Sequence, residues 1–284
     1  MNTKLLVPLL ALLFLIAGCS EDSSEPVMLT FNPEVGKTYN TTMDLDMNMT
    51  MMGMGTTMDM FFSMDMTIDD VSGDTIYVSA KYDHIKVKQQ VPMMGTIEYD
   101  SENPDAAKGM AGKIYKEQFG KMLNANLSML FNRKGKVIDF KGLNEVVSDS
   151  IQPQNMSQPD MTQYFENMMA IFPDSTVKVG STWTKEISTS NQFPMLVKNT
   201  YTLKSVKGDD VTIDIKGDMT LNEDEMEGVK IDTFKGSFTG TMIVDKNSGW
   251  TKSAEIKQTM EMEMNQMGQK MPMKMDMNMK MESK

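Results

Sequence analysis

Methionine occupies every second position over long stretches of this chain, and that spacing restricts the fold more than any other feature. In the N-terminal stretch the apolar residues are odd-numbered, namely Tyr39, Met43, Leu45, Met47, Met49 and Met51. Beyond a glycine-rich break they are even-numbered, namely Met58, Met60, Phe62, Met64, Met66 and Ile68. Because successive side chains of a β-strand point to opposite faces, this alternation predicts a hairpin with one apolar face.

The C-terminal stretch repeats the pattern around Gly268. Before this glycine the alternating residues are even-numbered, namely Ala254, Ile256, Gln258, Met260, Met262 and Met264; after it they are odd-numbered, from Met271 to Met281. The intervening positions hold Asp, Asn, Thr, Lys and Glu, which suit the solvent-facing side of an antiparallel sheet. The sequence therefore predicts a second long hairpin.

The middle of the chain has shorter strand patterns and two helical ones. Alternation continues through Ile76, Val78, Ala80, Tyr82, His84 and Lys86, and again through Leu123, Ala125, Leu127, Met129 and Phe131. Residues 110–122 and 161–172 instead carry apolar residues at helical spacing, and Pro173 ends the second segment. Residues 148–159, rich in Ser, Gln, Asn and Pro, indicate a loop.

Three short patterns recur in the same order in the two halves of the chain. Residues 35–39 (VGKTY) match 179–183 (VGSTW), 71–74 (VSGD) match 206–209 (VKGD), and 134–137 (KGKV) loosely match 247–250 (NSGW). Either a duplication or chance similarity between two β-meanders produces such matches. We expect a mainly β domain over residues 27–284, with antiparallel sheets in two similar halves, about 27–142 and 175–284. A connector at 143–174 joins them; two short central helical segments pack on a sandwich or barrel-like shell.

The N-terminus has the features of a lipoprotein signal peptide over residues 1–18. Lys4 precedes an apolar run at 5–17, and Ile16-Ala17-Gly18-Cys19 resembles a bacterial lipobox. As a helix this run of about 13 residues spans only about 20 Å, less than the roughly 30 Å of a bilayer core. We expect cleavage to leave Cys19 as a lipid-bearing N-terminus with a diacylglycerol and a palmitate-like acyl chain. An ordinary signal peptide with an incidental cysteine is the alternative.

Composition supports export and membrane attachment through the lipid. Cys19 is the only cysteine, so it has no disulfide partner within the chain. Residues 19–26 form an acidic flexible tether whose start resembles outer-membrane sorting signals and also surface-export signals, so the periplasmic face and the cell surface both remain open. The net charge of −11 repels nucleic acid and anionic headgroups. We therefore expect a lipid-anchored outer-membrane protein that binds no nucleic acid.

The methionine-alternating strands, residues 96–104 (TIEYDSENP) and residues 177–183 (VKVGSTW) together resemble a family of lipoproteins from Bacteroidota. The domain that defines this family has no known function. The resemblance covers most of the chain beyond the tether and implies a location in the cell envelope. It supplies no catalytic residues.

The methionines allow three interpretations. Thioether sulfur prefers Cu(I), and Met47, Met49 and Met51 would point the same way at about 6.8 Å spacing along one strand. However, methionine takes nearly every apolar position of the terminal hairpins, so these side chains are also needed as core. A methionine-lined face also adapts to apolar ligands or partners.

Signatures of enzymes are scarce. His84 is the only histidine, and no nucleophile motif of the form G-x-S-x-G occurs, so we expect His84 to be an ordinary strand residue. The run from Asp44 to Asn48 opens like a calcium loop, but Gly55 stands where the loop requires glutamate. Trp183 and Trp250 follow equivalent glycine turns, which favours packing over sugar binding.

These observations favour a non-enzymatic, lipid-anchored envelope lipoprotein that needs no cofactor and binds an apolar small molecule or an envelope partner protein. The alternative is a methionine-rich periplasmic protein that binds copper as Cu(I).

Overall fold

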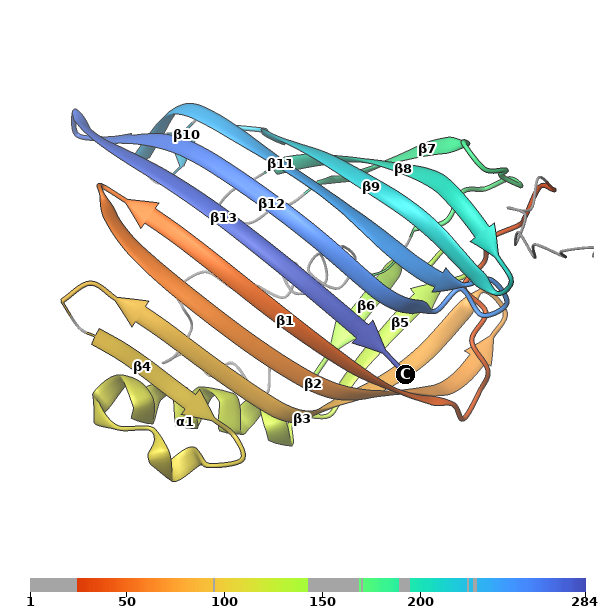
Figure 1. Ribbon diagram of the computed structural model, residues 1–284, viewed down its shortest axis with the longest axis horizontal. Coiled ribbons are helices and arrows are strands. Elements are labelled where there is room, and N and C mark those ends of the chain that lie inside the picture. Colours follow the sequence, from red (N-terminus) through yellow and green to blue (C-terminus); the bar gives the residue numbers. More distant parts are fainter. Residues whose placement is uncertain are drawn as a thin grey trace, which may run out of the picture.

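The computed structural model describes residues 25–93, 95–142, 169, 171–188, 195–223, 225–226 and 229–284. Most of these residues belong to one antiparallel sheet of thirteen strands (Figure 1). The signal peptide, Cys19, the loop at 148–159 and most of the second expected helix lie outside the described residues. Within the described part, no helix is long and apolar enough to span a bilayer.

The sheet is a meander in which neighbours along the chain are neighbours in space. Its order is β6-β5-β3-β2-β1-β13-β12-β11-β9-β8-β7, with β4 added to β3 and β10 added to β11. The strands are β1 (Thr38–Met51), β2 (Met54–Ser72), β3 (Thr75–Val91), β4 (Gly95–Asp100), β5 (Leu127–Asn132), β6 (Val137–Lys141), β7 (Thr182–Ser188), β8 (Met195–Lys207), β9 (Asp210–Leu221), β10 (Glu225–Met226), β11 (Val229–Asp245), β12 (Thr251–Gln266) and β13 (Gln269–Ser283). The last strand pairs with the first, so the two expected hairpins lie side by side.

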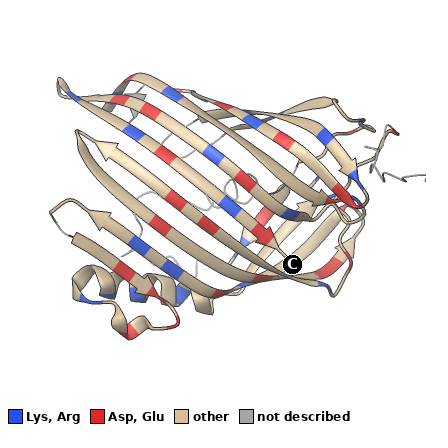
Figure 2. Ribbon diagram, viewed as in Figure 1, with Lys and Arg blue, Asp and Glu red and all other residues tan. Residues whose placement is uncertain are grey.

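Both terminal hairpins form, and the alternating apolar residues face inward as predicted. In β1, Met43 and Leu45 are buried whereas Asp44 and Asp46 are exposed. Met43 lies opposite Phe62 of β2 and Met281 of β13, which places the methionines of all three strands on one inner face. The outer face carries the charges, visible as blue and red bands across the strands in Figure 2.

Two segments outside the sheet fill one end of the shell, and we call them the plug: residues 27–33 and 171–177. Val27 and Val177 exchange backbone hydrogen bonds, and Phe31 and Phe172 are fully buried. The Phe31 ring lies 5.3 Å from that of Phe131 and 5.8 Å from that of Trp250, measured between centroids. The plug therefore packs between β5 and the start of β12, at what we call the plug end.

The plug also links the two edges of the open sheet. The β6 and β7 strands stand at opposite ends of the strand order and do not pair with each other in the part of the chain that the structure describes. Asp174 of the plug forms ion pairs with Lys134, in the β5–β6 turn, and with Lys185 of β7, at 3.2 and 3.7 Å. Trp183 of β7 donates a hydrogen bond from Nε1 to the Ile171 carbonyl oxygen at 2.7 Å. Side chains and the plug thus connect edges that no strand pairing closes.

The two halves repeat the same local geometry. The amide of Gly36, before β1, donates a hydrogen bond to the Ile68 carbonyl oxygen at 2.8 Å. The amide of Gly180, before β7, donates one to the Leu203 carbonyl oxygen at 2.8 Å. Both glycines have positive φ, 82° and 87°, a conformation that other residues adopt only with strain. The expectation of a mainly β, antiparallel fold is therefore confirmed, and the strands β1 and β7 begin with the same local geometry.

Two expectations need correction. Alternation does not carry on through His84 and Lys86, because a bulge between β2 and β3 at Ser63/Met64 inserts an extra residue and turns Ile85 and Val87 inward instead. Leu123 belongs to the single described α-helix, α1 (Gly109–Asn124), and the strand expected from it starts only at Leu127. The helix packs on β3 and β4, and η1 (Pro104–Ala106) precedes it.

Candidate functional site: a methionine face

The inner face of four adjacent strands is lined by methionine in the half of the sheet away from the plug. We call this set the methionine face: Met47, Met49 and Met51 of β1, Met58 and Met60 of β2, Met260, Met262 and Met264 of β12, and Met271, Met273, Met275 and Met277 of β13. Eleven of these twelve side chains are half-buried and Met262 is fully buried. The face is therefore a continuous thioether surface that is partly open to solvent.

Strand register brings these methionines together across strands. Met47 lies opposite Met58 on one side and Met277 on the other. One pleat further on, Met49 lies opposite Met275, and Met275 opposite Met260. Side chains directly opposite in antiparallel strands have Cβ atoms about 4.5–5.5 Å apart, closer than the 6.8 Å spacing along one strand. The sequence identified Met47, Met49 and Met51, but not their partners, because pairing between β1 and β13 joins residues more than two hundred positions apart.

Burial falls along β1 and β13 from the plug end to the methionine face. In β1, Met43 and Leu45 are buried, whereas Met47 and the methionines after it are half-buried. In β13, Met279 and Met281 are buried, whereas Met277 is half-buried. Toward the plug the face is a packed core, and away from it the same kind of side chain is accessible.

A buried polar side chain on the same inner face has no partner. Asn199 of β8 is 0% exposed and stands between the buried residues Val197 and Tyr201, yet neither its Oδ1 nor its Nδ2 has a hydrogen-bond partner. Its neighbour across the strands is Gly217. The Phe238 ring occupies the space that a side chain at Gly217 would need. Burial of an unpaired amide is unfavourable, so Asn199 is a group that a bound polar atom would satisfy.

A small cavity lies between the methionine-rich strands and the plug. It has a volume of about 20 Å³. Its walls include Met43, Met66, Met169 and Met281, together with Thr251, whose hydroxyl is buried without a partner. A space of this size admits about one water molecule, so it is too small for a larger ligand.

The one cluster of potential metal ligands found among the described histidine, cysteine and acidic side chains surrounds His84. His84 Nε2 lies 2.8 Å from Asp100 Oδ1, and Nδ1 lies 3.6 Å from Glu102 Oε1. Burial raises the pKa of the Asp100 carboxyl, but hydrogen bonds from His84, the Glu102 amide and Lys86 outweigh it and hold this pKa below its ordinary value. Because the two ring nitrogens face different carboxylates, the cluster is a cross-link between β3 and the end of β4. His84 therefore lies on a strand, as expected, and its side chain is hydrogen-bonded.

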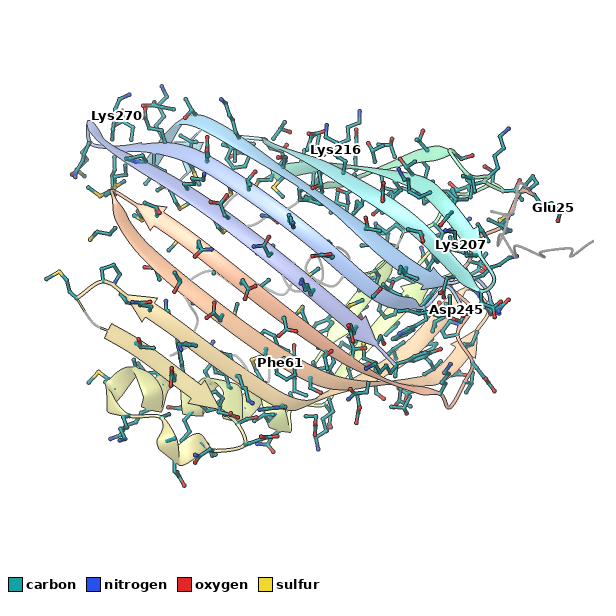
Figure 3. The ribbon with its side chains drawn as sticks, viewed as in Figure 1. Glu25, Phe61, Lys207, Lys216, Asp245 and Lys270 are labelled. Atoms are coloured by element: carbon teal, nitrogen blue, oxygen red, sulfur yellow. The ribbon has the colours of Figure 1, made fainter. Side chains whose placement is uncertain are left out.

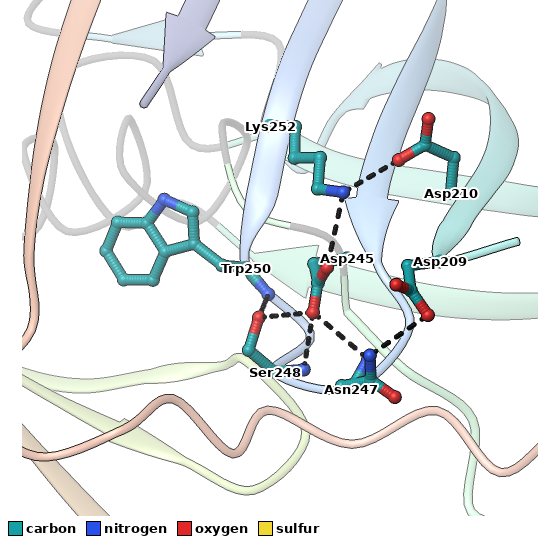
Figure 4. A network of polar contacts seen from close by, with 7 residues as sticks. All are labelled: Asp209, Asp210, Asp245, Asn247, Ser248, Trp250 and Lys252. Carbon is teal, nitrogen blue, oxygen red and sulfur yellow. Dashed lines mark hydrogen bonds and ion pairs between the residues drawn. The ribbon is translucent and has the colours of Figure 1, made fainter.

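A second polar network fixes the β11–β12 turn at the plug end (Figure 4). Asp245 accepts hydrogen bonds from the amides of Asn247 and Ser248 and from the Ser248 hydroxyl, at 2.9–3.1 Å. Lys252 forms ion pairs with Asp210 and Asp245 at 2.7 and 3.2 Å, and its hydrogen bond to Asp210 raises the pKa of its amine. Because two carboxylates pair with Lys252, its amine is held in the charged form. The network positions the turn.

The two tryptophans pack, as the sequence indicated. Trp250 is buried and donates from Nε1 to the Ser283 hydroxyl at 2.8 Å, while Trp183 stacks on Tyr201 with centroids 5.5 Å apart. Both lie at the plug end, far along the strands from the methionine face.

The fold and this site define a class: a β-shell formed by one open antiparallel sheet, plugged at one end and lined with accessible thioethers toward the other. Residues 73–251 match a family described as a family of unknown function, DUF6263. The chain therefore belongs to that family, and the expected membership of a domain of unknown function is confirmed. No curated protein matches the chain.

The solved structure of lipovitellin shares the fold at very low sequence identity. Lipovitellin, from a structure titled "Lipid-protein interactions in lipovitellin", matches with a TM-score of 0.58 and 9% identity over 88% of this chain. This chain spans only 25% of the lipovitellin chain. An outer membrane channel from Pseudomonas putida F1 aligns over 89% of this chain and 98% of its own, with 6% identity and a TM-score of 0.26. The translocator domain of the autotransporter NalP from Neisseria meningitidis aligns over 88% and 89%, with 5% identity and a TM-score of 0.26.

Proposed function

We propose that this protein is a non-enzymatic, lipid-anchored lipoprotein of the cell envelope that binds an apolar ligand on the methionine face. The observation that carries the proposal is the burial gradient along β1 and β13, where methionines change from buried to half-buried on one continuous inner face. Accessible apolar area of this extent binds apolar molecules because covering it removes it from water.

The chemistry of the side chain suits such a ligand. Methionine is unbranched and polarisable, so a surface made of it repacks around acyl chains of different shapes. Each methionine that becomes covered contributes about 1.5–3 kcal/mol at most, so contact with only a few of them gives measurable affinity. Lipovitellin, whose solved structure concerns lipid–protein interactions, supports a lipid-like ligand by fold analogy alone.

A titration with a fluorescent fatty acid tests this proposal with matched variants. Met47, Met49 and Met275 are changed together to Gln in one variant and to Leu in the other. Gln keeps the size but adds a polar amide, so we expect the affinity to fall at least about tenfold, the equivalent of 1.4 kcal/mol. Leu keeps the apolar surface, so affinity should stay within about threefold of the wild type. Equal binding by the Gln variant, or no binding by the wild type, would contradict the proposal.

Copper as Cu(I) is the second candidate. It is favoured by the register that sets Met47 beside both Met58 and Met277, because three neighbouring thioethers form a soft ligand set. The same Leu variant separates the two candidates when Cu(I) is titrated against a competing chelator. Copper binding would be lost with the sulfur atoms while fatty-acid binding persists.

The proposal also includes a lipid anchor at the N-terminus. A lipid on Cys19 and cleavage after Gly18 would hold the protein in the outer membrane, on its periplasmic face or at the cell surface. The lone cysteine in an apolar lipobox-like setting supports this assignment. Two or more acyl chains suffice for stable anchoring.

A further inference from the structure

Three hairpin tips at the end opposite the plug each carry an exposed methionine. Met52 lies in the β1–β2 turn, Met93 in the β3–β4 turn and Met267 in the β12–β13 turn, and their exposed fractions are 45%, 103% and 100%. These three turns project together at the left of Figure 1. Figure 3 shows Lys270 at the same end, next to the β12–β13 turn, whereas Glu25, Lys207 and Asp245 lie at the plug end.

All three methionines adopt a backbone conformation that methionine disfavours. Their φ angles are 52°, 65° and 51°, and in the described part of the chain no other residue except glycine has a positive φ. Tight hairpin turns ordinarily use Asn, Asp or Gly at such positions. The plug-end turns do so, with Gly73-Asp74 and Gly208-Asp209. Methionine at the tips therefore strains the backbone and exposes apolar surface. Neither stability nor solubility favours methionine at these positions.

Two pairs of opposite charges lie close to the tips. Behind Met267, Lys270 contacts Glu263 at 2.6 Å; behind Met93, Lys88 contacts Glu98 at 3.3 Å. A hollow of about 650 Å³ between the β1–β2 and β3–β4 tips has no charged residue in its wall, which includes Asn48, Thr50, Thr57, Gln90 and Met93. In a chain with a net charge of −11, this hollow therefore presents no charge.

We propose that the three methionine tips dock this end of the protein on a lipid bilayer, with the Met52, Met93 and Met267 side chains entering the boundary between headgroups and acyl chains. Single apolar side chains on separate hairpins fit a deformable surface, whereas a protein partner would need a separate pocket for each. The uncharged hollow and the two paired lysines reduce the local repulsion between this acidic protein and headgroups. The proposal does not depend on what the methionine face binds.

The tips lie at the opposite end of the sheet from Val27, which is bonded to Val177 in the plug. Binding through the tips is tested without the lipid that we propose on Cys19. The test uses residues 19–284, which contain every contact described above, with Cys19→Ala to remove the lipid. The native tryptophans, Trp183 and Trp250, are buried and give a constant background.

A tryptophan placed at a tip reports insertion directly. Met267→Trp and Met52→Trp are mixed with vesicles of phosphatidylcholine and phosphatidylethanolamine that carry brominated acyl chains. We expect the emission to shift to shorter wavelength and to be quenched by bromine. Asp74→Trp, in an exposed turn at the plug end, is the control and should show neither change. Quenching at the tips no greater than at residue 74 would overturn the proposal.

A triple variant provides the second measurement. Asn tolerates positive φ, so Met52→Asn, Met93→Asn and Met267→Asn together should leave the fold intact. We expect the fraction that floats with vesicles to fall at least tenfold while fatty-acid affinity is unchanged, which separates this proposal from the ligand proposal. Unchanged flotation would overturn it.

Discussion

The ring of Tyr39, at the start of β1, stacks on the ring of Trp250, just before β12, with centroids 3.9 Å apart and planes at 8°. Trp250 in turn donates to Ser283 at the end of β13. These contacts join the first strand of one half to the last two strands of the other. They sit directly beneath Phe31 of the plug, so the aromatic cluster fixes the closed end of the shell.

Removal of the Tyr39 hydroxyl should not weaken the fold. This hydroxyl is buried and has no hydrogen-bond partner, so Tyr39→Phe is expected to change the free energy of unfolding by no more than about 1 kcal/mol, or to raise it. Trp250→Ala removes the stacked ring and should cost about 3–5 kcal/mol. Urea unfolding measures both. A loss above 2 kcal/mol for Tyr39→Phe would mean that its hydroxyl has a partner.

The side-chain amides of Asn199 and Asn132 differ in hydrogen bonding, since the first is unpaired and the second is bonded. Asn199→Leu removes an unpaired buried amide, so the ligand-free protein should gain about 1–3 kcal/mol. Asn132→Leu is the matched control, because Asn132 Oδ1 accepts hydrogen bonds from the amides of Lys134 and Lys136 and its removal should destabilise the protein. Thermal unfolding compares the two variants. Equal losses in both would show that Asn199 is satisfied in the folded protein.

The Asp245 network predicts a defined pH dependence. Burial raises the pKa of this carboxyl, but hydrogen bonds from Ser248, Lys252 and Asn247 more than offset this effect and lower it below its ordinary value. A lowered folded-state pKa contributes stability above the unfolded value of about 3.9, and this contribution is lost as the pH falls through the folded-state pKa. Wild type should therefore exceed Asp245→Asn in stability at neutral pH, and the difference should shrink below about pH 4.

Urea midpoints measured across this range provide the check. Asp46→Asn, an exposed substitution on β1, controls for the change in net charge. A difference between wild type and Asp245→Asn that stays constant down to about pH 2 would contradict the linkage.

The lipid anchor is tested in cells. Wild type should incorporate an alkyne-labelled palmitate and fractionate with the outer membrane, and Cys19→Ala should do neither because the thiol is the attachment point. Ser20→Ala is a neighbouring control that keeps the label. Labelling of Cys19→Ala equal to wild type would place any lipid elsewhere.

Period-two alternation was enough to predict the hairpins, because one-sided burial fixes which residues face inward. Alternation did not predict the change of face at His84, because a bulge adds one residue without any break in hydropathy. Pairing of β1 with β13 also escaped it, and that pairing is what assembles the methionine face. The tips at Met52 and Met267 looked like simple glycine turns, because their positive φ is a backbone property that composition does not reveal.

Native mass spectrometry of the protein, purified from its own cell envelope in mild detergent, tests ligand binding on the methionine face most directly. We expect an apolar adduct, released by organic solvent, that is retained when Met47, Met49 and Met275 are changed to Leu and lost when they are changed to Gln. A wild-type protein that carries no adduct and takes up none from added lipid would contradict it.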